Sequence, residues 1–197
     1  MELTERVTNE TRDAANVLVL RPQLQSGSDA TCKRLLVGDE RPVHLLGISF
    51  SRPATQWYDH WVEVLGDAPA AAAVVTTPDS FAGDPPDGVA VETVSSPADA
   101  TGIGMQVTKY LNDWQDEDAA VVVSLDSLTL VLQYVSVETL YRFLHVLTGR
   151  LDAVGATGLF FLDPTTQDET TVNTLKTLFH GVLAYDADAD DWRLQTQ

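Results

Sequence analysis

The sequence predicts an α/β fold: a three-layer sandwich with helices on both faces of a mostly parallel central sheet. The 197 residues are 44% hydrophobic, which is enough apolar material for one sizeable core. Short apolar runs alternate along the chain with stretches of helical periodicity. Several runs, such as AAVVVSL and TGLFFL, are apolar throughout, which is typical of parallel strands that are buried on both faces.

The apolar runs define the predicted strands. Five apolar runs stand out, and a sixth run and a short final strand follow near the end of the chain. One further run partly alternates in polarity and is expected to be an edge strand. In chain order, the strands are expected at 17–20, 43–50, 71–76, 89–94 (the edge strand), 119–125, 158–162, 182–185 and 192–194.

The segments between the strands have helical spacing and recognisable ends. We expect Asp29 to cap the first helix and Pro53 to open the second. Gly155 is a plausible stop for the longest helix, and Gly181 is expected to close the last one. The segment 79–88, DSFAGDPPDG, is the clearest surface loop. The helices are expected over 30–36, 53–66, 101–114, 137–155 and 168–181.

Residues 1–13 form a polar N-terminal segment, and 14–197 are expected to form a single domain because no linker divides them. The N-terminal segment lacks the apolar core of a secretory signal, and no apolar run approaches the ~20 residues of a membrane span. A cytoplasmic protein without membrane insertion is therefore expected. The single cysteine, Cys32, excludes an intrachain disulfide and a cysteine-based metal site, and its expected role is that of a small buried hydrophobe.

The charge balance is strongly acidic. The chain has 29 acidic against 12 basic residues and a net charge of −17. An Asp-rich, Lys-poor surface suits a halophilic cytoplasm, where salt screens carboxylate repulsion, and in this respect the chain resembles haloarchaeal proteins. The alternative is an ordinary acidic protein. The acidity argues against a broad DNA or RNA surface, which needs clustered Lys and Arg.

The stretch 118–164 contains the strongest pattern: VVVSLDS, then RFLHVLTGRL, then GLFFLDP, followed further on by VNTLKTLFHGVLAYD. This order resembles the RecA-like ATPases of the KaiC-like group, in which an apolar strand ends in Asp-Ser and a helix and another apolar strand follow. The resemblance extends over about residues 14 to 187. It implies a RecA-like (P-loop NTPase-like) topology, with Asp126 at the metal-organising (Walker B) position. The expected relatives are haloarchaeal proteins of unknown function, some labelled transducer-like, that look like shortened KaiC-like domains.

The first predicted strand is followed by RPQLQSGSDATCKRLL, where a nucleotide-binding protein of this type has its phosphate loop. Such a loop needs G-x-x-x-x-G-K-[ST], so that backbone N–H groups and the lysine can contact the phosphates. Here Gly27 is the only glycine, Ser28 stands where the lysine would follow, and Lys33 falls inside the helix. Asp29 adds a negative charge where a phosphate would otherwise bind.

The resemblance also implies a catalytic carboxylate pair at the end of the second strand. Ser51 and Arg52 stand there instead, in GISFSRPA. We therefore expect no catalytic residues. The residues left as a vestigial nucleotide site are Arg21, Gly27, Ser28, Lys33, Asp126 and Ser127, with Asp126 as the metal-site candidate and Arg21 and Arg52 as anion-binding candidates.

Each of these residues also has a plainer interpretation. Asp126, at a strand end, can cap the next helix. Arg21 and Arg52 can form surface ion pairs with nearby acids. The four histidines lack metal-ligand spacing, and packing is the default role of His145 beside an apolar helix stripe.

The expected function is that of a non-catalytic KaiC/RecA-like domain that binds a protein partner or itself, in a regulatory or signalling role, without a cofactor. The alternative is a nucleotide-binding sensor or weak ATPase with an unconventional loop, whose ligands would be ATP and Mg²⁺. That alternative would use Asp126 together with Lys33 or Arg21. Enzymatic activity is left open, with a non-enzyme preferred.

Overall fold

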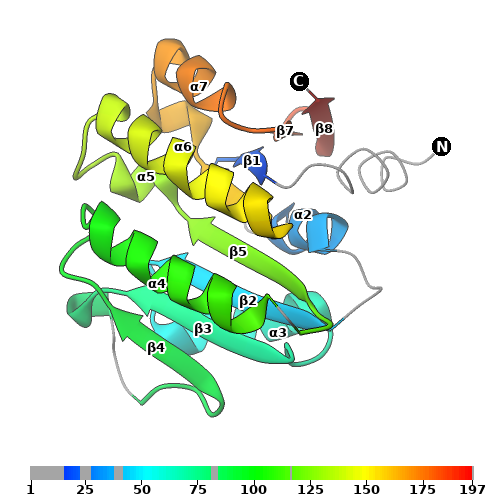
Figure 1. Cartoon of the computed structure of the whole chain (residues 1–197). Coiled ribbons are helices and arrows are strands. Elements are labelled where there is room, and N and C mark those ends of the chain that lie inside the picture. Colours follow the sequence, from blue (N-terminus) through cyan, green and yellow to red (C-terminus); the bar gives the residue numbers. More distant parts are fainter. Residues whose placement is uncertain (1–15, 23–27, 38–41, 81–83, 116, 197) are drawn as a thin grey trace.

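The computed structural model describes residues 16–22, 28–37, 42–80, 84–115 and 117–196, and shows an eight-stranded sheet between two layers of helices (Figure 1). The predicted polar segment 1–13 lies outside the described residues. The strand order is β4-β3-β2-β5-β6-β1-β7-β8. The strands are β1 (Asn16–Leu20), β2 (Val43–Ser49), β3 (Ala71–Thr76), β4 (Val89–Thr93), β5 (Ala120–Asp126), β6 (Thr157–Leu162), β7 (Gly181–Asp186) and β8 (Asp191–Thr196).

The sheet is parallel except for β8, which pairs antiparallel with β7. The first strand, β1, lies between β6 and β7, so it is buried on both sides. All parallel strands end at the same edge, and this is the edge at which open α/β sheets bind ligands. The predicted α/β class is confirmed, and each predicted strand is present within two residues at either end.

Helices cover both faces of the sheet. Buried side chains of α2 (Ser28–Val37) and α3 (Ala54–Leu65) share one core with one sheet face. The other core includes buried residues from four helices, α4 (Ala100–Trp114), α5 (Leu128–Val131), α6 (Val137–Val154) and α7 (Glu169–Lys176). Short 3₁₀ turns occur at Pro78–Ser80 and Pro164–Thr166. Within the described ranges, no helix is both long and apolar enough to cross a bilayer.

The helix ends follow local chemistry. Asp99 caps α4 by accepting a hydrogen bond from the Gly102 N–H at 2.8 Å. Gly155 ends α6 as expected, because its φ of 68° lies in the left-handed region. The long apolar stripe of α6 is buried as predicted, through Leu140, Leu144, Leu147 and Leu151.

The last helix differs from the prediction. It ends at Lys176 rather than at Gly181, and Gly181 is the first residue of β7. The reason is Phe179, which is buried with its ring 5.1 Å from the ring of Phe160. Burial of this ring continues the core after the helix, and the chain then enters β7 directly.

Candidate functional site: a buried ion cluster at the end of β1

The candidate site begins where β1 ends. Arg21 follows β1 directly, and its backbone N–H donates to the Leu162 carbonyl at 3.1 Å, which holds it at the edge of the sheet. Helix α2 starts at Ser28, with Asp29 in its first turn. The helix therefore presents its N-terminal end and an acidic side chain near the edge at which open α/β sheets generally bind ligands.

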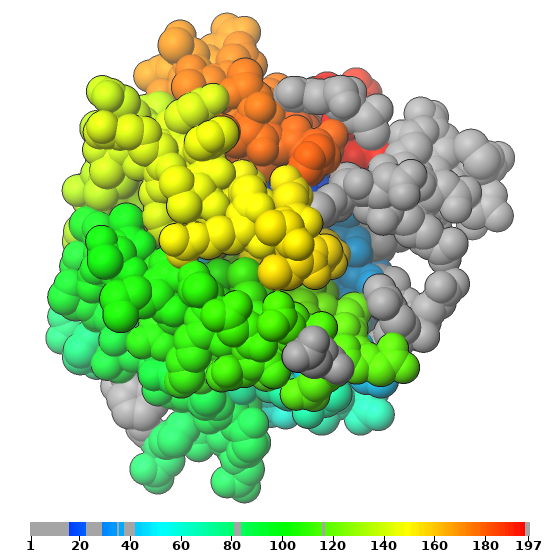
Figure 2. Space-filling model, in the orientation of Figure 1, coloured from blue at the N-terminus to red at the C-terminus, as the bar shows by residue number. Residues whose placement is uncertain are grey.

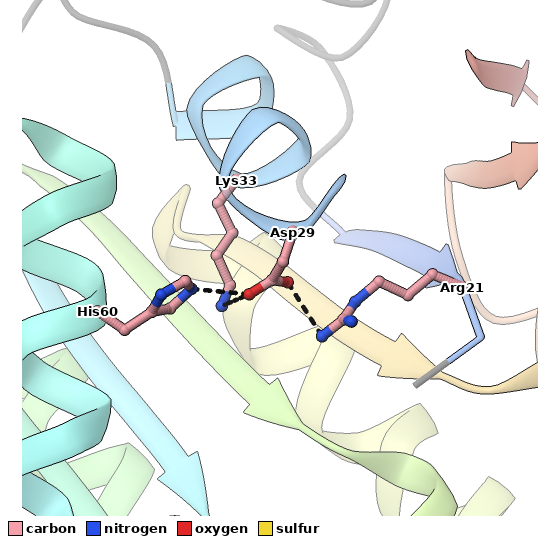
Figure 3. A network of polar contacts seen from close by, with 4 residues as sticks. All are labelled: Arg21, Asp29, Lys33 and His60. Carbon is pink, nitrogen blue, oxygen red and sulfur yellow. Dashed lines mark hydrogen bonds and ion pairs between the residues drawn. The ribbon is translucent and has the colours of Figure 1, made fainter. Parts of the chain in front are cut away.

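Asp29 is the centre of the cluster (Figure 3). Its Oδ2 atom accepts a hydrogen bond from Lys33 Nζ at 2.8 Å and lies 2.7 Å from His60 Nε2. Its Oδ1 atom lies 3.1 Å from Arg21 Nη2. The side chains come from three separate parts of the chain: the end of β1, helix α2 and helix α3. One carboxylate thus binds two cations and an imidazole.

The cluster is deeply buried. The exposed fractions are 3% for Asp29, 1% for Lys33 and 7% for Arg21, whereas the His60 side chain is 24% exposed. Burial of ionic groups is tolerated only where partners replace the lost water, and here the charges themselves are those partners. Lys33 is consequently part of the core and is not available at the surface.

Aromatic rings surround the two cations. Lys33 Nζ lies 4.9 Å from the centre of the Trp61 ring and 5.1 Å from that of Phe161. Arg21 Cζ lies 5.6 Å from the same Phe161 ring. Such cation–π contacts partly compensate the desolvation of the charges. They explain why a long basic side chain can lie among the aromatic residues of this core.

The charges fix the protonation state of Asp29. Burial alone would raise the pKa of this carboxyl, but the hydrogen bond from His60 and the charges of Lys33 and Arg21 outweigh it. The pKa of Asp29 therefore lies well below its ordinary value, and the group is a carboxylate at neutral pH. The prediction that Asp29 caps the helix is wrong, because the residue lies inside α2 and its oxygens bind side chains.

Cys32 lies on the same helix and is fully buried. Burial, followed by the negative charge of Asp29, raises the pKa of its thiol well above the ordinary value. A thiol of this kind is unreactive at neutral pH. The expected role of Cys32 as a small buried hydrophobe is thus consistent with its surroundings.

The Asp126-Ser127 pair lies at the end of β5. Asp126 is the last residue of β5 and pairs in register with Ser49 of β2. Ser127, and not Asp126, caps the next helix: its backbone is extended, and its Oγ accepts from the Leu130 N–H at 3.4 Å. The plainer interpretation of Asp126 as a helix cap is therefore wrong by one residue. A residual metal or nucleotide role for Asp126 stays a prediction.

The other predicted residues are only partly brought together. Arg21 and Lys33 meet at Asp29, but β5 and β6 separate the end of β1 from the end of β2, which precedes Arg52. Three strand spacings amount to about 14 Å between these strand ends. Gly27 lies outside the described residues, and Ser28 is the first residue of α2. In the parts of the chain that the structure describes, no three His, Cys, Asp or Glu side chains gather closely enough to hold a metal ion.

The sequence pattern did not predict the surroundings of His60 and His145. His60 was not predicted in the cluster, and its place beside Trp61 in the sequence gives no signal of the contact with Asp29. The prediction that His145 packs in the core is wrong, because its side chain is exposed while its neighbour Leu144 is buried. Successive helical residues differ in direction by about 100°, so adjacency to an apolar stripe does not bury a side chain.

Comparison with solved structures supports the topology. The protein PH0250 from Pyrococcus horikoshii OT3 is similar over 98% of this chain and 92% of its own, with a TM-score of 0.64 and 11% identity. The uncharacterized protein PH0321 from Pyrococcus horikoshii, solved in complex with an unknown peptide, is similar over 92% of this chain and 83% of its own, with a TM-score of 0.58 and 13% identity.

A third similar structure is an ATPase from the type III secretion system of pathogenic bacteria. It matches 88% of this chain and 51% of its own, with a TM-score of 0.52 and 11% identity. These likenesses show a RecA-like fold. No curated protein matches the sequence. The model of a family of unknown function (DUF7504) matches residues 14–185. The chain therefore belongs to the DUF7504 family.

Proposed function

We propose that this chain is a KaiC/RecA-like domain that has lost nucleotide binding and acts through association with other proteins. The observation that supports this is the buried carboxylate of Asp29, which pairs with both Lys33 and Arg21. In a working phosphate loop, the helix N-terminus and a lysine bind phosphate oxygens. Here the carboxylate of Asp29, in the first turn of α2, binds basic side chains of the kind that would otherwise bind phosphate oxygens.

An incoming triphosphate would meet two obstacles at this site. It would be repelled by Asp29, whose pKa is lowered and whose charge therefore persists at neutral pH. It would also need to recruit Lys33, which is buried against Trp61 and Phe161. Recruitment of that lysine would break a buried ion pair, at a cost of about 3–5 kcal/mol.

Association with proteins is the function that a retained scaffold without its nucleotide can still perform. The similar protein PH0321 was solved in complex with an unknown peptide, which supports a peptide or protein as the partner of this chain. A regulatory or signalling role in a salt-rich cytoplasm fits the net charge of −17.

The test is calorimetric titration of the full chain with ATP and Mg²⁺ in molar KCl, together with an ATP turnover assay. We expect neither binding heat nor turnover. Saturable binding, or turnover that disappears in Asp126→Ala, would refute the loss of nucleotide binding. The variant Asp79→Ala, in the 3₁₀ turn after β3, is the matched control for removal of an acidic side chain.

One observation favours the nucleotide-binding alternative. Two cations face a single carboxylate in the cluster, and among the described residues the buried Arg21 Nε has no hydrogen-bond partner. Such a donor suits an additional anion. If this second function holds, the same titration gives ATP binding that Arg21→Ala removes and Arg142→Ala retains.

A further inference from the structure

A surface groove runs between α4 and α6, on the face of the sheet opposite the ion cluster. It has a volume of about 570 Å³. Met105, Thr108 and Lys109 line it from α4, and Phe143, Val146 and Arg150 line it from α6. In Figure 2 the yellow surface of α6 adjoins the green surface of α4 along this seam.

Apolar side chains in the groove are unusually exposed. Met105 is 67% exposed and Val146 is 52% exposed, and both are among the few large hydrophobic residues that the described chain leaves in water. Phe143, which also lines the groove, is half-buried and packs against the core. Exposed apolar groups that gather in one groove are typical of a binding surface, and methionine adapts its shape to different partners.

The charge of this region contrasts with the rest of the molecule. Although the chain has a net charge of −17, α4 and α6 together carry equal numbers of basic and acidic residues. The groove lining itself includes two basic residues and no acidic one. The basic residues on the two helices are Lys109, Arg142 and Arg150, and the acidic ones are Asp113, Glu138 and Asp152.

Arg150 is held in position across the groove. Its Nη1 donates to the Thr108 Oγ1 at 2.8 Å and to the Gly104 carbonyl at 3.2 Å, so it links α6 to α4. Both acceptors are neutral, and within the described ranges no carboxylate forms an ion pair with Arg150. Lys109, by contrast, pairs with Glu92 at 2.7 Å. Arg150 thus offers a positioned positive charge to an external carboxylate.

We propose that this groove binds an amphipathic helical segment of a partner protein, with apolar side chains against Met105 and Val146 and a carboxylate at Arg150. This rests on the proposed function, because it assigns the surface used for association. Helix-in-groove binding needs an apolar stripe and matching charges, and both are present here. A second copy of this chain is a poorer occupant, since a two-fold contact through the groove would bring like basic charges together.

The probe is a fluorescently labelled synthetic amphipathic helix with leucines on one face and glutamates beside them, titrated with the full chain in molar KCl. We expect saturable binding that Val146→Asp weakens at least about tenfold, because the new charge lies in the apolar contact. At 1 M salt the screening length is about 3 Å, so a loss of about threefold or more in Arg150→Glu would report a direct ion contact.

Matched controls lie on the same helix. Val154→Asp alters an exposed apolar residue (40% exposed) outside the groove, and Arg142→Glu reverses an exposed charge outside it. Both should bind the probe as the wild type does, and a probe with lysines in place of the glutamates should bind more weakly. Unfolding curves for all four variants identify any loss of binding that comes from loss of fold.

Three results would overturn the proposal: no binding by the wild type, equal losses in the groove variants and controls, or a self-associated species in sedimentation that Val146→Asp dissociates. The last result would assign the groove to a second copy. The loss of nucleotide binding is tested separately, by the ATP titration. The two tests are independent because no groove residue belongs to the Asp29 cluster.

Discussion

Lys33 and Asp29 form an ion pair one turn apart on α2, with Nζ and Oδ2 separated by 2.8 Å and both side chains almost completely buried. The sequence order, with the acid four residues before the base, is the favourable one for a helix. A buried pair of this kind is not necessarily more stable than apolar residues of the same size, but breaking it leaves an uncompensated charge in the core. The cluster can therefore be tested through stability.

Removal of the central charge should be costly. In Asp29→Asn, Lys33 and Arg21 remain buried without their carboxylate, so we expect the free energy of unfolding to fall by about 3–5 kcal/mol. Denaturant unfolding in molar KCl measures this. In the control, Glu138→Gln, the lost contact is an exposed pair with Arg142 at 3.8 Å, and the expected change is below about 1 kcal/mol. Equal losses of stability in the two variants would contradict the prediction that the buried charge of Asp29 stabilises the fold.

Lys33 and Asp29 should be energetically coupled. Lys33→Met keeps much of the volume of the side chain but leaves Asp29 with fewer partners, so it should be destabilising alone. In the double variant Asp29→Asn/Lys33→Met, one buried unpaired charge is removed as well, and the combined loss should be smaller than the sum by about 0.5–3 kcal/mol. A double-mutant cycle from unfolding curves measures this coupling, and strict additivity would exclude it.

The stabilisation should also depend on pH. The pKa of Asp29 in the folded chain lies below the ordinary value of 3.8, so its contribution is fully present above about pH 4–5 and is lost as the pH falls through the lowered pKa. The stability difference between wild type and Asp29→Asn should accordingly narrow as the pH falls below 3.8. Other carboxylates titrate in both proteins and cancel. If the stability difference between the two proteins instead grows as the pH falls, the pKa of Asp29 is raised in the folded chain and not lowered.

The fold was largely predictable because its signals are local. Runs such as AAVVVSL need no long-range information to be assigned as buried strands, and Gly155 ends α6 through its own backbone conformation. The error at the end of α7 occurred where a distant contact decides. Phe179 turns the chain into β7 because it packs on Phe160, a residue 19 positions earlier whose proximity no local pattern announces.

The site was predictable as a set of residue types but not as an arrangement. The prediction that Asp29 disfavours a phosphate follows from its position near the helix start. Its actual partners, Arg21, Lys33 and His60, come together only once β1 and α3 are both packed on α2. From the local sequence alone, a helix cap was the better interpretation of Asp29. In the folded chain its carboxylate binds these charged and polar side chains instead.

Cys32 should report on the opening of this region. It is the only cysteine, it is fully buried, and burial raises the pKa of its thiol. An aromatic disulfide reagent should therefore react with the native chain at least about a hundredfold more slowly than with the unfolded chain. Reaction should be faster in Asp29→Asn, because less free energy is then needed to open the structure around Cys32. Rapid reaction of the native wild type would show that α2 does not cover this thiol.

Two glycines should respond in opposite directions to alanine. A Cβ at Gly47 of β2 would overlap the indole ring of the buried Trp57, so Gly47→Ala should lower the free energy of unfolding by about 1–3 kcal/mol. At Gly149 of α6 a Cβ meets nothing within 4 Å, and alanine should stabilise the helix by about 0.5–1 kcal/mol. Denaturant unfolding of both variants measures the contrast. A tolerated Gly47→Ala would mean that α3 packs less closely on β2, and hence that His60 is not fixed against Asp29 as described.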